Sequence, residues 1–117
     1  MTQFQTITIE LPKRSYFPVA KTVTFSRPQW EFRHLQTVSD DCLRSELITC
    51  GHSVLGTMRK QGDTGDSFEL SESLAHFQLY AEQCEERGFQ SHVEYVAEEL
   101  AIAVARLQEQ QSKAGTP

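Results

Sequence analysis

The N-terminal part of the chain alternates between apolar and polar side chains, with one interruption. Within 4–11, Ile7, Ile9 and Leu11 fall on one side of an extended chain and polar residues fall on the other. This period of two is typical of a half-buried strand. After a basic, aromatic segment with a proline near each end, the alternation resumes over 19–25. These patterns predict an antiparallel pair of strands joined by a loop.

Residues 26–38 carry two competing patterns. Trp30, Phe32 and Leu35 have the spacing of a short helix, whereas Trp30, Phe32 and His34 alternate as they would in a strand. We favour a third strand over this segment, because a two-stranded sheet alone is only marginally stable in water.

The rest of the chain shows the three-and-four spacing of amphipathic helices. A first helix is predicted from Ser39 or Asp40, either of which is suited to cap it, to about Lys60. A second helix is expected to end before Gly88, because glycine commonly terminates helices. The sequence Ser-His-Val-Glu at 91–94 matches a capping box and is expected to open a third helix.

These elements predict an α+β fold, in which a short N-terminal antiparallel sheet of two or three strands packs against three helices. The last two helices are expected to form an antiparallel hairpin. The length of 117 residues suits one domain, which we assign to 1–111, with 112–117 as a frayed polar tail. The core is expected to include Ile7, Ile9, Val19, Val23, Phe25, Trp30, Leu43, Leu47, Phe77 and Leu100.

Each of the last two predicted helices also carries a second apolar set, away from its main stripe. Phe68, Ala75 and Leu79 form this set on one helix, and Tyr95 and Ile102 form it on the other. A helix that exposes its back to water needs only one apolar stripe. Either these helices are sandwiched within the monomer, or their hairpin presents an apolar seam to another chain.

Charge is distributed unevenly along the chain. The net charge of −5 combines +3 over residues 1–60 with −8 over residues 61–117. An acidic half of this size favours a basic protein partner, or a homodimer in which opposite poles meet, over wrapping in nucleic acid. The alternative is that the acidic residues only coat the solvent face of the helices.

The sequence contains few signals for catalysis, cofactors, export or membranes. An odd set of three cysteines predicts a reducing cytoplasm, and we expect no membrane association, because neither a secretion signal nor a long apolar run is visible. Phosphate-binding loops, zinc-protease spacings and EF-hand spacings are missing from the sequence. We therefore assign no catalytic, cofactor-binding or metal-binding residue.

Two weak metal-ligand patterns leave a question open. Glu31 and His34 have the Glu-x-x-His spacing of carboxylate-bridged metal sites, but the chain offers no second pair. The sequence alone leaves undecided whether a mixed thiolate and imidazole site forms from Cys42, Cys50, His52, Cys84 and His92.

The leading functional hypothesis is a small, non-enzymatic protein-interaction or inhibitor module. It would bind a protein partner, or itself, through the acidic C-terminal helical hairpin. Its size and charge are those of accessory proteins of phages and mobile elements, an analogy that rests on no shared residues. The expected contact residues are Phe68, Leu79, Glu86, Tyr95, Glu98, Glu99 and Ile102.

The alternative is a dimeric nucleic-acid-binding regulator that uses the basic and aromatic N-terminal half. Interleaved cations and aromatic rings are what single-stranded nucleic acid requires, through phosphate pairing and base stacking. The residues expected to carry this binding are Lys13, Arg14, Tyr16, Lys21, Arg27 and Arg33.

Overall fold

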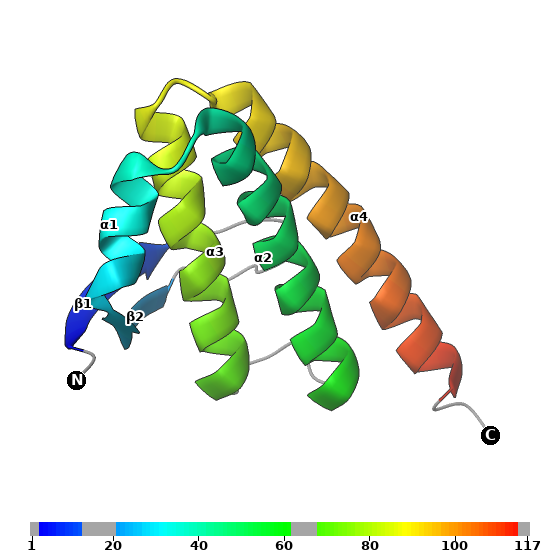
Figure 1. Ribbon diagram of the computed structural model, residues 1–117. Helices are drawn as coiled ribbons and strands as arrows, with labels where there is room; N and C mark the ends of the chain where they lie inside the picture. Colours follow the sequence, from blue (N-terminus) through cyan, green and yellow to red (C-terminus); the bar gives the residue numbers. More distant parts are fainter. Residues whose placement is uncertain (1–2, 13–20, 62–67, 115–117) are drawn as a thin grey trace.

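The protein folds into a small N-terminal sheet and four helices (Figure 1). The structure, a computed structural model, describes residues 3–12, 21–61 and 68–114. The elements are β1 (Phe4–Leu11), β2 (Lys21–Pro28), α1 (Gln29–Thr37), α2 (Asp40–Gln61), α3 (Phe68–Glu86) and α4 (Gln90–Ala114). The predicted α+β fold is confirmed: the two-stranded antiparallel sheet packs against helices, and the last two helices are in contact and run in opposite directions (Figure 1).

The two strands divide their side chains as the alternation predicts. Ile9 pairs with Val23 in the antiparallel register, and both side chains are buried in the core. The opposite face is exposed and lined with hydroxyls, where Thr8 and Thr24 share a hydrogen bond of 3.0 Å between their Oγ1 atoms. The sheet therefore has one face on the core and one face in solvent, as antiparallel sheets commonly do.

The expectation of a third strand over 26–38 is wrong, because β2 ends at Pro28 and the chain continues directly into α1. The backbone N–H of Gln29 donates to the carbonyl of Gln3 at 2.9 Å, which satisfies one of the first donors of the helix. Helical spacing then turns Glu31 and Leu35 inward and leaves Trp30 55% exposed. The placement of Trp30 in the core was consequently also wrong.

Most of the other expected core residues are confirmed. Ile7 is half-buried, and Val19 lies outside the described residues. The expected residues that are buried are Ile9, Val23, Phe25, Leu43, Leu47, Phe77 and Leu100.

Helix α3 is the central element, because it contacts both strands and the other three helices. Its second apolar set is mainly used inside the monomer: Ala75 is fully buried and Leu79 packs against the core. By contrast, α4 lies mainly along α2 and leaves Tyr95 and Ile102 exposed. The second apolar set is therefore mostly packed inside the monomer on α3, whereas on α4 it is exposed to solvent.

The helix ends follow local capping chemistry. The Ser39 hydroxyl accepts from the backbone N–H of Cys42 at 3.3 Å, which confirms it as the N-cap of α2. At the end of α3, Gly88 has φ +92°, and the N–H of Phe89 donates to the carbonyl of Cys84 at 2.8 Å. This is a Schellman motif. Helix α4 begins at Gln90, so the predicted capping box at 91–94 lies within its first turns rather than at its cap.

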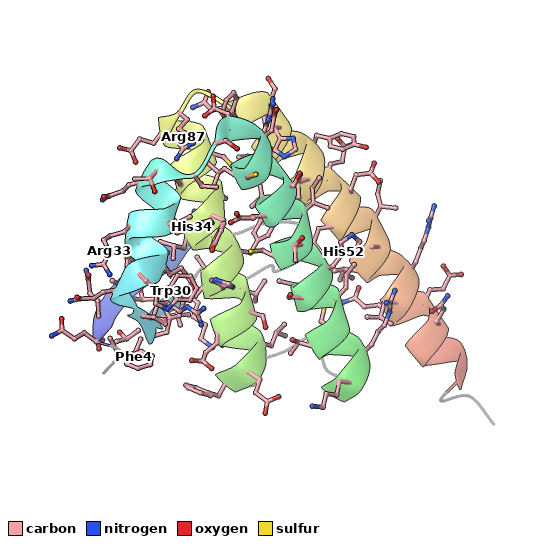
Figure 2. All side chains as sticks on the ribbon, viewed as in Figure 1. Phe4, Trp30, Arg33, His34, His52 and Arg87 are labelled. Carbon is pink, nitrogen blue, oxygen red and sulfur yellow. The ribbon has the colours of Figure 1, made fainter. Side chains whose placement is uncertain are left out.

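Arg87 connects the α3–α4 turn to the junction between α1 and α2, at the top of the view in Figure 2. Its guanidinium donates to the carbonyls of Leu35 (2.7 Å) and Val38 (2.6 Å), and to the Asp40 carboxylate (3.0 Å). The two carbonyls lie at the C-terminal end of α1, where carbonyls have no partner within the helix. The Arg87 side chain thus connects the end of α3 to both α1 and α2.

We predict that Arg87→Ala destabilises the protein by about 2 kcal/mol, because two partly buried carbonyls lose their charged donor. The measurement is urea denaturation followed by far-UV circular dichroism. Arg106→Ala, which removes an exposed arginine from α4, is the matched control and should change stability by less than about 0.5 kcal/mol. Equal effects of the two substitutions would contradict this role for Arg87.

Replacement of two glycines by alanine should change the folding stability in opposite directions. Gly56 lies exposed within α2, where an added Cβ would meet nothing within 4 Å, so Gly56→Ala should stabilise by about 1 kcal/mol. Gly88→Ala should destabilise by about 1 kcal/mol, because the left-handed conformation is strained for alanine. Thermal melting of both variants checks the pair, and a change of the same sign in both would refute it.

Candidate binding surfaces

The predicted interaction residues do not form one continuous patch. Phe68 is 71% exposed at the start of α3, while Tyr95 lies in α4 beyond the turn at the other end of α3. A helix of 19 residues separates these ends by about 27 Å. Leu79 is half-buried, and Glu86 is exposed at the end of α3.

One member of the predicted set on α4, Glu99, lines an apolar groove between α2 and α4. The groove has a volume of about 190 Å³, and its lining is mainly aliphatic, with one imidazole and one carboxylate. The lining residues are Ile48, Gly51, His52, Leu55, Val96, Glu99, Leu100 and Ala103. Figure 2 shows His52 on α2, on the side that faces α4.

Large apolar side chains around this groove remain in solvent. Ile48 on α2 is 41% exposed, and on α4 Tyr95 and Ile102 are 59% and 42% exposed. Tyr95, Glu99 and Ile102 follow steps of four and three, which places them on one face of α4. A cluster of exposed apolar side chains beside an apolar groove is typical of an interaction site.

The first half of α4 carries three exposed carboxylates, one of which lines the groove. Glu94, Glu98 and Glu99 are all exposed, and Glu99 lines the groove itself. Arg106 follows one turn beyond Ile102. The groove therefore combines a mainly apolar lining with one carboxylate, and α4 carries further negative charge outside the lining.

Two of the six predicted nucleic-acid residues are engaged in contacts within the protein. The Lys21 Nζ donates to Ser71 Oγ at 2.7 Å, and Arg27 pairs with Glu31. Arg33 is exposed on α1, on the same side of the molecule as Phe4 and Trp30 (Figure 2). The other three residues of that set, Lys13, Arg14 and Tyr16, lie outside the described residues.

The candidate metal ligands lie apart. Within the described ranges, no group of three or more histidine, cysteine or acidic side chains is arranged to hold a metal ion. His92 Nε2 donates to the carbonyl of Arg44 at 3.1 Å, while His52 and Cys42 are exposed. Cys50 and Cys84 are buried in the core, and burial raises the pKa of the Cys50 thiol to about 12. At neutral pH Cys50 therefore stays a protonated thiol, which is a poor metal ligand.

Glu31 occupies a site that the sequence analysis missed. Its side chain is 2% exposed, and its carboxylate accepts from Arg27 at 3.1 Å (Nε) and 2.5 Å (Nη2). His76 Nε2 donates to the same carboxylate at 2.9 Å. Three elements, β2, α1 and α3, therefore meet at one buried charge. His34, the partner that the Glu-x-x-His spacing suggested, donates instead to Glu46 at 2.7 Å.

The environment of this site lowers the pKa of both Glu31 and His76. Burial alone would raise the pKa of the Glu31 carboxyl, but the Arg27 hydrogen bonds and the charges of Arg27 and His76 outweigh it, and the pKa is lowered. Burial lowers the pKa of His76 below its ordinary value, against the opposing effect of Glu31. Since Nε2 donates to the carboxylate, Nδ1 is the unprotonated nitrogen of the neutral ring. The Tyr80 ring packs edge-on against His76, with 5.0 Å between centroids.

Comparisons with protein-family models, curated proteins and solved structures find no match to this chain. None of the described helices is long and apolar enough to cross a membrane. The binding surfaces are therefore interpreted from their own chemistry.

We predict that folding stability falls as the pH is lowered from 7.5 to 4. A histidine with a lowered folded-state pKa stabilises the fold above its ordinary value of 6.5, and this contribution is lost as the pH falls below that value. The lowered pKa of Glu31 adds a second loss below 4.5. Urea denaturation across this pH range measures both losses.

The His76→Gln variant keeps an N–H donor for Glu31 and removes the imidazole titration. In this variant the free energy of unfolding should change less between pH 7.5 and 5.5 than in the wild type. The control is His52→Gln, at an exposed position, which should show the same pH dependence as the wild type. A wild-type protein that gains stability on going from pH 7.5 to 5.5 would contradict the assigned direction.

Proposed function

We propose that this protein is a non-enzymatic interaction module whose α2–α4 groove binds a basic amphipathic helix of a protein partner. The observation that carries the proposal is the apolar groove of about 190 Å³, which the exposed Ile48 lines, with the exposed Tyr95 and Ile102 on the same face of α4 as its lining residue Glu99. Such a groove suits an inserted helix that presents one apolar face.

The spacing of the exposed side chains supports a helical partner. Tyr95 and Ile102 are seven residues apart on α4, which corresponds to about 10 Å along the helix axis. Apolar anchors at positions i and i+7 of a partner helix have the same spacing. Each anchor of the partner could therefore pack beside one exposed side chain of α4.

Charge complementarity supports a basic partner. Glu99 lines the groove, Glu94 and Glu98 are exposed elsewhere on the first half of α4, and residues 61–117 carry a net charge of −8. Lysine or arginine on the polar face of the partner helix would lie against these carboxylates and accelerate association. An acidic module of this kind could inhibit a partner by covering its basic surface.

We further propose that the protein works in the cytoplasm, which is consistent with three cysteines that form no disulfide. The accessory role in phages or mobile elements also stays a proposal, supported by size and charge. Nucleic-acid binding is the less favoured alternative, because Lys21 and Arg27 are held in contacts within the protein. A homodimer on the same groove is the competing occupant, and the experiment below separates it from a foreign helix.

The test measures fluorescence anisotropy of a labelled 18-residue amphipathic helix of leucine and lysine, titrated with the full chain. A matched peptide of leucine and glutamate controls for charge. We expect saturable binding of the basic peptide only. Ile102→Ser should weaken it about tenfold, since it removes an apolar contact at the groove.

Phe68→Ser is the control, because it removes an exposed apolar side chain outside the groove, and it should bind as the wild type does. Reversal of Glu98 and Glu99 to lysine should weaken the basic peptide, while Glu82→Lys on α3 should not. Equal binding of both peptides, or equal loss in the Ile102 and Phe68 variants, would reject the proposal. Light scattering that gives twice the monomer mass of 13.3 kDa, with loss of the dimer on Ile102→Ser, would assign the groove to a second copy instead.

A further inference from the structure

A second pocket lies on another side of α2, between β2, α2 and α3, and differs in chemistry from the apolar groove. Its volume is about 290 Å³, and its lining is mostly polar. The lining residues are Phe25, Arg27, Ser53, Thr57, Glu69, Glu72, Ser73 and His76. The binding module proposed above makes no use of these side chains.

Two hydroxyls of this pocket already donate their hydrogens in hydrogen bonds within the protein. Thr57 Oγ1 donates to the carbonyl of Ser53 at 3.0 Å, within α2. Thr57 Oγ1 and Ser73 Oγ are also 3.0 Å apart. Because a hydroxyl has a single hydrogen, Thr57 must accept from Ser73 in that second bond. The Ser73 oxygen then has free lone pairs and accepts from no donor among the described residues.

His76 also offers a hydrogen-bond acceptor to the pocket, because the one N–H of its neutral ring is already donated elsewhere. Its Nε2–H is donated to the buried Glu31 carboxylate at 2.9 Å, so that Nδ1 carries a lone pair in the neutral ring. No described residue donates to Nδ1. The lowered pKa of His76 favours this neutral form at pH 7. The Glu31 contact thus fixes which nitrogen is available to a ligand.

The charge of the pocket is negative on balance. Arg27 is the only guanidinium in the lining, and it is bound through Nε and Nη2 to Glu31, which neutralises it. Glu69 and Glu72 add two carboxylates, and that of Glu72 forms no hydrogen bond with any described residue. The ring of Phe25 adds an apolar wall. Acceptors therefore prevail in the pocket.

We propose that this pocket binds a primary alkylammonium group. Such a group has three N–H donors, no acceptor and one positive charge. The acceptors that would receive its hydrogens are Ser73 Oγ, His76 Nδ1 and the Glu72 carboxylate, while the alkyl stem packs against Phe25. This chemistry occurs in free diamines and polyamines and in the lysine side chain of a protein.

The test is an NMR titration of the ¹⁵N-labelled full chain at pH 7.5 with n-butylammonium. We expect saturable shifts, centred on the amides of Ser53, Thr57 and Ser73. Tetramethylammonium has the charge without N–H donors, and butyrate has the opposite charge, so neither should produce these shifts. Glu72→Gln should weaken n-butylammonium about tenfold by removing a charged acceptor, whereas Glu82→Gln, at a position outside the pocket, should not.

A parallel titration with 1,4-diaminobutane distinguishes the two sources of the group. Binding at least about tenfold tighter than that of n-butylammonium would identify a free diamine or polyamine, since a second ammonium then contributes. Equal affinity would support a single ammonium, as on a lysine side chain. The proposal is overturned if n-butylammonium gives no saturable shift in this pocket, if tetramethylammonium or butyrate matches it, or if Glu72→Gln binds unchanged. Ile102→Ser leaves this pocket intact, so failure here is distinguishable from failure at the α2–α4 groove.

Discussion

Helix α3 has to bury two faces at once, and the arrangement of the other elements depends on this constraint. Leu74, Phe77 and Ala81 follow steps of three and four, so that they share one buried face of the helix. Ala75 is fully buried on another side. A helix of this kind is stable only between two layers. The sheet with α1 covers one side of α3, and α2 covers the other (Figure 1). The buried Glu31 carboxylate adds a polar contact between the first of these layers and α3.

The same arrangement explains why the molecule has an apolar groove and a polar pocket on different sides of α2. Helix α2 packs against α3 on one side and α4 on the other, and nothing in the described part of the chain covers the outer face of α2 and α4. Exposed aliphatic side chains therefore collect at that face. At the α3 side of α2, hydroxyls and carboxylates meet the end of β2 and form the polar pocket. The apolar groove and the polar pocket, for which we propose different occupants, are thus separated by a single helix.

Sequence patterns predicted the elements better than their contacts. The alternation around Ile9 and the stripe through Leu47 identified a strand and a helix, because those periods depend on local geometry alone. Trp30 was wrongly assigned to the core, because both the helical spacing and the strand alternation fit a segment as short as the nine residues of α1. The Glu31–His76 contact joins residues 45 positions apart, which no local spacing encodes. Ala75 and Ile102 belonged to similar second stripes, and only the tertiary packing made one buried and the other exposed.

The central claim is that the outer face of α2 and α4 is uncovered in the free protein, while the sheet is buried against α3. Isoleucine methyl labelling tests it directly, because the chain has four isoleucines: Ile7, Ile9, Ile48 and Ile102. A soluble gadolinium chelate should strongly broaden the signals of Ile48 and Ile102 and affect Ile9 least. Protection of Ile48 and Ile102 equal to that of Ile9 would contradict the account.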